Sequence, residues 1–179
     1  IHTDFPTKFG VPRQSGLVIG LPARIVFTPE FRNADALRGL EGFSHIWLLW
    51  DFSEAHDGKP WRPTFRPPRL GGNRRMCVWA TRSPFRPNHI GLSCVRILSI
   101  DLHTSQGPVI CVDGADLMDG TPILDIKPYL PFTDCHPDAR GGFAQEQNER
   151  LEPLEVCIPA HLEHLIPEEK RESVRAILS

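Results

Sequence analysis

Proline limits the fold of this chain more than any other residue, because 18 of its 179 residues are proline and they are spread along the whole length. A proline inside a helix removes a hydrogen bond and collides with the preceding turn, and a proline inside a central strand interrupts the hydrogen-bond ladder. Long elements are therefore disfavoured. The pattern predicts many short elements joined by rigid turns, which favours a mainly β architecture.

Short apolar runs bounded by turn residues mark the expected strands. They lie at residues 24–27, 43–52, 76–81, 93–101, 109–114, 123–126 and 154–158. The run at 43–52 is so continuously apolar that burial on both faces is expected. Turn residues separate the runs at 93–101 and 109–114, which predicts an antiparallel hairpin. About seven short strands with a few short helices predict a small closed β-barrel, since closure removes exposed edges.

The expected helices are few. Residues 29–40 suit one short helix, with Asn33 as its cap and Gly39 at its end, and a second helix is expected after Pro167. Helical patterns do not alternate with the strand runs, and no GxGxxG motif follows a strand. Both observations argue against a Rossmann fold.

The length fits one domain with a small addition. We expect a β-barrel domain at residues 1–132, a polar loop or linker at 133–150, and a C-terminal strand and helix at 151–179. No apolar run approaches a membrane span and no signal-peptide pattern opens the chain, so the expected location is cytoplasmic. Five widely spaced cysteines without a CxxC pair suggest neither a disulfide framework nor a metal site.

Arginine is concentrated in one stretch. Seven arginines lie between residues 62 and 86, where the chain has no Asp, Glu or Lys, although its net charge is −2. Prolines rule out a continuous helix there, so the arginines are expected in loops. Guanidinium groups held in loops suit phosphate or carboxylate, which indicates a polyanion or a phosphate-rich ligand. The alternative is a solvated loop neutralised by the acidic remainder of the chain.

Four loop segments rich in Pro, Gly and polar residues are candidates for ligand contacts, because rigid loops bind at low ordering cost. They are residues 12–14, 69–73, 81–88, and 116–122 continuing into 125–129. The residues Asp119 to Pro122 are either part of such a site or a plain turn. Asp125 and Lys127 would lie on one face of a strand, so they either contribute to a site or form a salt bridge with each other.

Four strings bring these segments together: FGVPRQSGLV, LRGLEGFSHIWLLWDF, RPPRLGGNRRMCVWATRSPFRPNHIGLS and DLMDGTPILDIKPYLPF. In this order they resemble the TrmO (TsaA-like) family of tRNA adenine N-6 methyltransferases, over residues 5–132. The resemblance implies a small β-barrel unlike the Rossmann methyltransferases, assembly as a homodimer, and S-adenosylmethionine as methyl donor. It implies as substrate the threonylcarbamoyl-adenosine at position 37 of a tRNA.

The resemblance also implies site residues where the motifs match. The implied donor contacts are Pro12, Arg13, Gln14, Ser53, Glu54, Arg82, Leu92, Asp119, Gly120, Thr121 and Pro122. Ser53 and Glu54 stand where relatives carry a His-containing pair. Two further departures are His89, where the family usually has proline, and Cys77, where glycine is common.

Residue chemistry suggests further roles. The acceptor nitrogen must lose a proton, and the candidates to accept it are Asp119, Asp125 and Tyr129, with Asn88 orienting the substrate. For contacts to RNA phosphates the candidates are Arg66, Arg69, Arg74, Arg75 and Arg86. A base of the anticodon loop would stack on Phe85, Trp79 or Tyr129, unless Trp79 belongs to the core.

Two other functions remain as alternatives. A non-catalytic RNA- or phospholigand-binding β-barrel would use the same arginines and have no affinity for S-adenosylmethionine. A metal-dependent hydrolase would rest on the eight histidines, whose spacing is not that of metal ligands. Neither metal nor membrane is expected as a partner.

Overall fold

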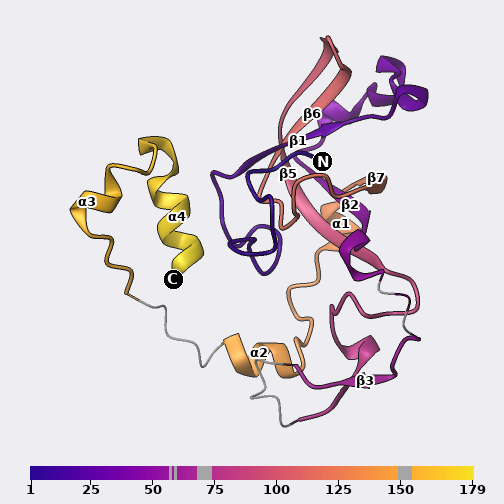
Figure 1. Ribbon diagram of the computed structural model, residues 1–179. Coiled ribbons are helices and arrows are strands. Elements are labelled where there is room, and N and C mark those ends of the chain that lie inside the picture. Colours follow the sequence, from indigo (N-terminus) through magenta and orange to yellow (C-terminus); the bar gives the residue numbers. More distant parts are fainter. Residues whose placement is uncertain (57, 59, 68–73, 149–154) are drawn as a thin grey trace.

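The protein is built on one antiparallel sheet. The computed structural model describes residues 1–56, 58, 60–67, 74–148 and 155–179 (Figure 1). The five-stranded sheet has the order β1 (Pro22–Val26), β6 (Gly107–Asp113), β5 (Ile90–Thr104), β2 (His45–Asp51) and β7 (Ile123–Pro128). β3 (Thr64–Phe65) and β4 (Met76–Cys77) form a separate two-stranded sheet. The predicted mainly β class and the antiparallel hairpin, β5–β6, are confirmed.

The expected closed barrel is wrong. Within the described residues β1 pairs with β6 alone among the named strands and β7 with β2 alone, so the five-stranded sheet is open at both edges. β3 and β4 pair with each other instead of bridging those edges. Both are only two residues long, and prolines at positions 63 and 67 flank β3. Because proline cannot donate to a ladder, the strand has little length with which to close the sheet.

The first predicted helix is three short turns instead of one helix. They are η1 (Pro29–Phe31), η2 (Ala34–Leu37) and η3 (Leu40–Gly42). Asn33 caps η2 as predicted, because its side chain accepts a 3.0 Å hydrogen bond from Asp35 N. Gly39 has φ of 88°, which breaks the helical path before η3. The other helical segments are η4 (Ser53–Ala55), η6 (Val78–Ala80), α1 (Pro131–Asp134), α2 (Phe143–Asn148), α3 (Ala160–Glu163), η7 (Glu168–Lys170) and α4 (Arg171–Leu178).

The main core lies on one face of the sheet. Along β2 burial alternates, with Ile46, Leu48 and Trp50 buried and their neighbours only half-buried. The expected burial of this strand on both faces is therefore wrong, since the residues on its second face are only half-buried. Ile110 and Val112 of β6 pack into the same core.

The C-terminal helices lie beside the N-terminal segment (Figure 1). Ser173 Oγ in α4 donates hydrogen bonds to Ile19 O at 3.0 Å and to Gly20 O at 3.2 Å, and Lys170 pairs with Asp4. Ile177 packs against a small N-terminal apolar cluster. Of the expected strand at 154–158, residue 154 lies outside the described residues and residues 155–158 form no strand. None of the described helices has the length and apolar character to cross a membrane.

Candidate functional site

A pocket of about 320 Å³ opens where β2 ends and β5 begins. The N-terminal loop and the segment before β5 complete its wall. The lining residues are Pro12, Arg13, Gln14, Trp50, Phe52, Thr81, Arg82, Arg86, Ile90, Gly91, Leu92 and Asp116. Its volume lies in the range of small-molecule sites, about 300–1,000 Å³.

The floor of the pocket carries a chain of hydrogen bonds that ends on an acid. Trp50 Nε1 donates to Ser93 Oγ at 3.0 Å, and Ser93 Oγ donates to Asp116 Oδ1 at 2.5 Å. Burial raises the pKa of the Asp116 carboxyl, while the Ser93 hydrogen bond and the charge of Arg82 act against this rise. A carboxylate held in this way offers a fixed negative charge to a bound cation.

Three arginines, Arg13, Arg82 and Arg86, give the opposite charge to the wall. Arg82 Nη1 donates to Gln14 Oε1, and Gln14 Nε2 donates to Arg13 O at 2.6 Å. These contacts join the N-terminal loop to the segment before β5, across 68 residues of sequence. Guanidinium groups beside a carboxylate floor create a site with both signs of charge, suited to a zwitterionic ligand.

A glycine lets the aromatic wall come close to β5. Gly91 is the cross-strand partner of Trp50, and a Cβ at position 91 would lie 2.2 Å from the Trp50 ring. Trp50 and Phe52 in turn have ring centroids 4.2 Å apart. The absence of a side chain at Gly91 therefore decides where the indole lies in the pocket.

The structure brings together five of the donor contacts implied by the resemblance. Pro12, Arg13, Gln14, Arg82 and Leu92 all line the pocket, although they come from two segments, 12–14 and 82–92, that are far apart in sequence.

The other implied donor contacts lie outside the described lining: Ser53, Glu54, Asp119, Gly120, Thr121 and Pro122. Asp119 accepts a 3.1 Å hydrogen bond from Thr3 N, and Pro122 O accepts one of 3.0 Å from Asp51 N. The loop from Asp119 to Pro122 thus ties the N-terminal segment to the end of β2.

The proton-acceptor candidates Asp119, Asp125, Tyr129 and Asn88 are also outside the described lining. Asp125 forms a 3.1 Å salt bridge with Lys127, so the predicted alternative of a salt bridge between these two residues is confirmed. The contact with Lys127 lowers the pKa of the Asp125 carboxyl. Tyr129 packs against Trp47, with ring centroids 5.7 Å apart.

Sequence reasoning gave no role to Asp116, although it placed this residue in a candidate loop. In the sequence, Asp116 is marked only by its position two residues after Gly114, and this position does not distinguish it from Asp119 as a candidate functional residue. Burial and the Ser93 hydrogen bond do separate the two, because Asp119 lies exposed at the surface.

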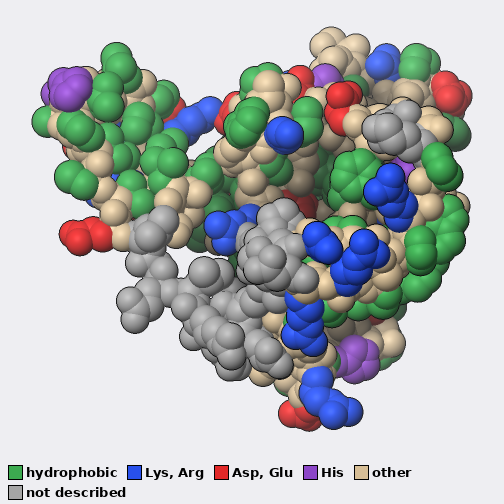
Figure 2. Space-filling view, turned by 60° about the horizontal axis from the view of Figure 1, so that its bottom comes forward, with side chains coloured by type: hydrophobic (Ala, Val, Ile, Leu, Met, Phe, Trp, Pro, Cys, Tyr) green, Lys and Arg blue, Asp and Glu red, His purple; other side chains and the backbone are tan. Residues whose placement is uncertain are grey.

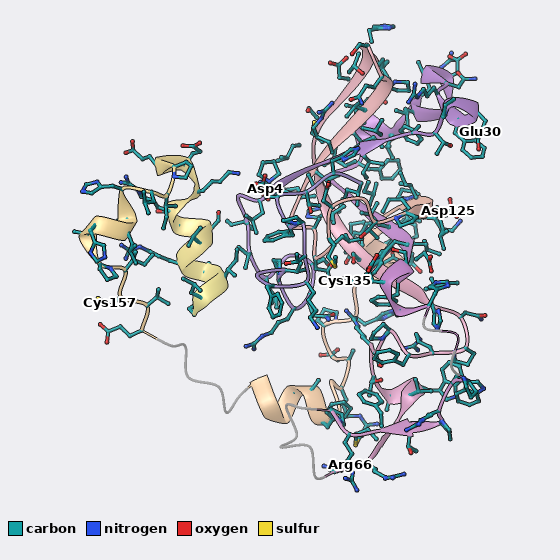
Figure 3. All side chains as sticks on the ribbon, in the orientation of Figure 1. Asp4, Glu30, Arg66, Asp125, Cys135 and Cys157 are labelled. Carbon is teal, nitrogen blue, oxygen red and sulfur yellow. The ribbon has the colours of Figure 1, made fainter. Side chains whose placement is uncertain are left out.

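The predicted RNA-contact residues that are described lie on or next to β3 and β4. Arg66, Arg74 and Arg75 are exposed, and Figure 2 shows Lys and Arg side chains gathered on this face. Figure 3 places Arg66 at the end of the molecule opposite Glu30. Arg69 and residues 71–73 lie outside the described residues.

The fifth predicted arginine, Arg86, is held by the protein itself. Its Nη1 donates to Thr81 O at 2.8 Å and to Ser83 O at 3.4 Å. Trp79 is 64% exposed, so the core position considered for it is wrong. Among the described residues no three His, Cys, Asp or Glu side chains lie close enough together to hold a metal ion.

Comparisons with known proteins agree with this arrangement. The family model for the tRNA-methyltransferase O N-terminal domain matches residues 1–135. The tRNA (adenine(37)-N6)-methyltransferase of Escherichia coli K12 is 49% identical over 145 residues, covering 81% of this chain and 61% of that protein. A probable S-adenosyl-L-methionine-binding protein of Pyrococcus abyssi is 34% identical, covering 85% of this chain and 76% of that protein.

A solved structure is similar as well. The crystal structure of TrmO from Pseudomonas aeruginosa aligns with a TM-score of 0.61 and 37% identity, over 79% of this chain and 58% of that one. The chain thus spans about three fifths of the length of the Escherichia coli and Pseudomonas proteins. Because the family model covers residues 1–135 of 179, the chain belongs to the family of the tRNA-methyltransferase O N-terminal domain.

Proposed function

We propose that this protein is an S-adenosylmethionine-dependent tRNA methyltransferase that methylates the exocyclic N-6 of threonylcarbamoyl-adenosine at position 37. The observation that carries the proposal is the pocket, in which motif residues from three distant segments meet over the acid Asp116. The names of similar proteins support the same reaction.

The pocket chemistry fits the methyl donor. When bound, S-adenosylmethionine supplies an electrophilic methyl group on a cationic sulfur. Arg13 and Arg82 bind the donor carboxylate, and Asp116 binds its ammonium group. Trp50 and Phe52 form an aromatic wall, which suits a cation and keeps water away from it.

The remaining implied donor contacts are part of the proposal. Ser53 and Glu54 follow Phe52 directly, and Pro122 accepts a hydrogen bond from Asp51 at the end of β2. A donor that extends past Phe52 would reach them, together with Asp119, Gly120 and Thr121.

Methyl transfer is an in-line displacement, so the chain contributes mainly by fixing the donor and orienting the acceptor nitrogen. Asp119, Asp125 and Tyr129 remain the proposed proton acceptors, with Asn88 as the orienting group. Each of these four residues would act from outside the described pocket lining, on an adenosine that enters the pocket from the side where the residue lies.

The proposal includes partners and location. Arg66, Arg69, Arg74, Arg75 and Arg86 would contact the tRNA, and the protein would act in the cytoplasm. We propose a homodimer, because the sheet has two open edges among the described residues and large apolar side chains such as Phe132 are exposed. Light scattering at several concentrations tests the dimer.

The deciding experiment is a methylation assay. The purified chain is incubated with S-adenosylmethionine and tRNA that carries threonylcarbamoyl-adenosine, and the nucleosides are analysed by mass spectrometry. We expect the modified nucleoside to gain one methyl group, and unmodified tRNA serves as control. An unchanged mass would reject the reaction.

The arginine-rich surface favours one second candidate, a non-catalytic RNA-binding module. Calorimetry separates the two functions. The enzyme binds both S-adenosylmethionine and its demethylated product, whereas the module binds RNA with strong salt dependence and neither small molecule.

A further inference from the structure

Two tryptophans lie side by side on the surface at one end of the molecule. The ring centroids of Trp61 and Trp79 are 6.1 Å apart and their planes are inclined by 40°. The side chains are 48% and 64% exposed, although burial of an indole is favourable. Such an exposed pair indicates that these rings contact something outside the chain.

The backbone holds the pair in place. Trp61 precedes β3 and Trp79 follows β4, and these strands pair antiparallel with Thr64 opposite Cys77. Val78 N donates to Pro63 O at 2.9 Å, which continues the pairing toward the tryptophans. Val78 itself is buried, so it anchors the turn that presents Trp79.

An arginine connects the pair to the pocket. The guanidinium carbon of Arg86 lies 5.6 Å from the centroid of the Trp79 ring. Hydrogen bonds from Nη1 to Thr81 O and Ser83 O fix this position, and both Arg86 and Thr81 line the pocket. The aromatic surface therefore adjoins the proposed methyl-transfer site.

The charge around the pair selects the class of partner. Residues 58–93 include no Asp or Glu, and the exposed Arg66, Arg74 and Arg75 lie on the adjoining hairpin. Exposed aromatic rings among arginines are the usual surface for single-stranded nucleic acid, because bases stack on the rings while arginines meet phosphates. An apolar protein partner would require no such excess of positive charge.

We propose that Trp61 and Trp79 form a stacking platform for an unpaired RNA base, with Arg86 fixing the ring nearest the pocket. The inference rests on the proposed function and deepens it. The platform would hold a loop base next to the adenosine that enters the pocket, so that the exocyclic nitrogen is positioned by its neighbour.

The test measures binding of a fluorescently labelled anticodon stem-loop RNA by anisotropy, at several salt concentrations. Trp61→Ala and Trp79→Ala should each weaken binding about five- to a hundredfold, the loss expected for one stacked base. The salt dependence should stay unchanged, since neither substitution removes a phosphate contact. Trp61→Phe and Trp79→Phe should retain most of the affinity.

Phe31→Ala is the matched control, because Phe31 is 65% exposed in η1 next to Glu30, and Figure 3 places Glu30 at the opposite end of the molecule from Arg66, the residue that follows β3. Its RNA affinity should equal that of the unchanged protein. Titration with S-adenosylmethionine should give the same affinity for every variant. In the unchanged protein, RNA should quench tryptophan fluorescence, and each Phe variant should lose part of that quenching.

The outcomes separate the two proposals. If the protein methylates tRNA but the tryptophan variants bind RNA as Phe31→Ala does, the platform is rejected and the methyltransferase stands. If the tryptophans are needed for RNA binding but no methyl group is transferred, the platform stands and the reaction is rejected. Failure of the unchanged protein to bind the RNA rejects the platform, while the methylation assay alone decides the reaction. If an alanine variant does not fold, unaltered quenching in the Phe variants rejects the platform.

Discussion

Ser93 Oγ donates a 2.5 Å hydrogen bond to Asp116, across the boundary between the sheet and the pocket. Ser93 is fully buried and receives its own hydrogen bond from the Trp50 indole. The rigid sheet thus fixes the carboxylate through one hydroxyl group. Because Asp116 lines the pocket and is fixed by this hydroxyl group, it is better placed to orient a ligand there than Asp119 and Asp125, which lie outside the described lining.

Asp116→Asn should weaken S-adenosylmethionine binding by about 10- to 100-fold, since a hydrogen bond to a charged group contributes about 1.5–3 kcal/mol. Burial raises the pKa of the carboxyl, so the affinity of the unchanged protein should fall as pH decreases through that raised value. Asp116→Asn should lack this fall in affinity with decreasing pH. Calorimetry across pH measures both effects, with the exposed Asp138→Asn as control. An identical pH profile in Asp116→Asn would remove the acid from the donor site.

In the absence of ligand, Asp116→Asn should not destabilise the protein, in contrast to its unfavourable effect on donor binding. Folding raises the pKa of Asp116, so its ionised form costs the folded state free energy above that pKa, and the cost disappears as pH falls through it. Asp116→Asn should therefore melt no lower than the unchanged protein at neutral pH. A clearly lower melting temperature would show that the carboxylate is required for the fold.

Arg82→Ala should reduce S-adenosylmethionine affinity by about tenfold or more, because it removes a charged donor from the pocket wall and leaves Gln14 Oε1 without its hydrogen-bond donor. The chain offers a matched control in Arg24→Ala, since Arg24 Nη2 donates to Gln106 Oε1 at 3.1 Å and neither residue belongs to the described lining of the pocket. Calorimetry measures both variants. Equal S-adenosylmethionine affinities of the two variants would mean that Arg82 does not bind the donor.

Short-range features were predictable from sequence. Asn33 caps a helical turn because its carbonyl side chain mimics a backbone acceptor, and the β5–β6 hairpin follows from two apolar runs around turn residues. Motif residues such as Gln14 and Arg82 were predictable as one site only through a resemblance, since nothing local relates residues 68 positions apart.

Long-range pairing was not predictable. Residues 46–50 of β2 are all apolar, yet only alternate residues are buried, because burial depends on which layers cover the sheet. Whether a sheet closes depends on the pairing of its edge strands, and residue patterns do not fix that pairing. Asp116 and Asp119 look alike in sequence, and only the fold makes Asp116 half-buried and hydrogen-bonded to Ser93 while Asp119 stays exposed.

Asp113→Asn should lower the free energy of unfolding by about 2 kcal/mol at neutral pH, since a neutral amide replaces a carboxylate that accepts several hydrogen bonds, one of them from an arginine. Asp113 is 3% exposed and accepts hydrogen bonds from Leu21 N at 3.0 Å and from Arg96 at 3.0 Å. Burial alone would raise its pKa, but these bonds and those from Gly20 and Gly114 outweigh burial and lower it.

The sign of the pH effect follows from that lowered pKa. Asp113 stabilises the fold above its unfolded pKa, and this contribution is lost as pH falls through the folded value. Denaturant unfolding at several pH values should therefore show the gap between variant and unchanged protein narrowing in acid. A gap that stays constant would assign the loss to packing instead of charge.

Replacing Arg74 and Arg75 together by alanine should lower the affinity for tRNA. The slope of log affinity against log salt concentration should become less steep by about one for each phosphate contact removed. S-adenosylmethionine affinity should not change, because neither residue lines the pocket. The control is the double variant Arg32→Ala and Arg38→Ala, two exposed arginines around η2. Anisotropy over a range of salt measures the slopes, and equal slopes for both doubles would exclude Arg74 and Arg75 from phosphate contact.

Gly91→Ala should destabilise the protein by about 1–3 kcal/mol and abolish tight donor binding, since overpacking forces a large side chain from its position. The new methyl group would lie 2.2 Å from the Trp50 ring, while the indole is held by Ser93 and by the sheet. The control is Gly42→Ala, where an added Cβ meets nothing within 4 Å. Thermal melts and donor titrations of both variants measure the two effects. If Gly91→Ala binds the donor as Gly42→Ala does, the position of Trp50 does not shape the donor site.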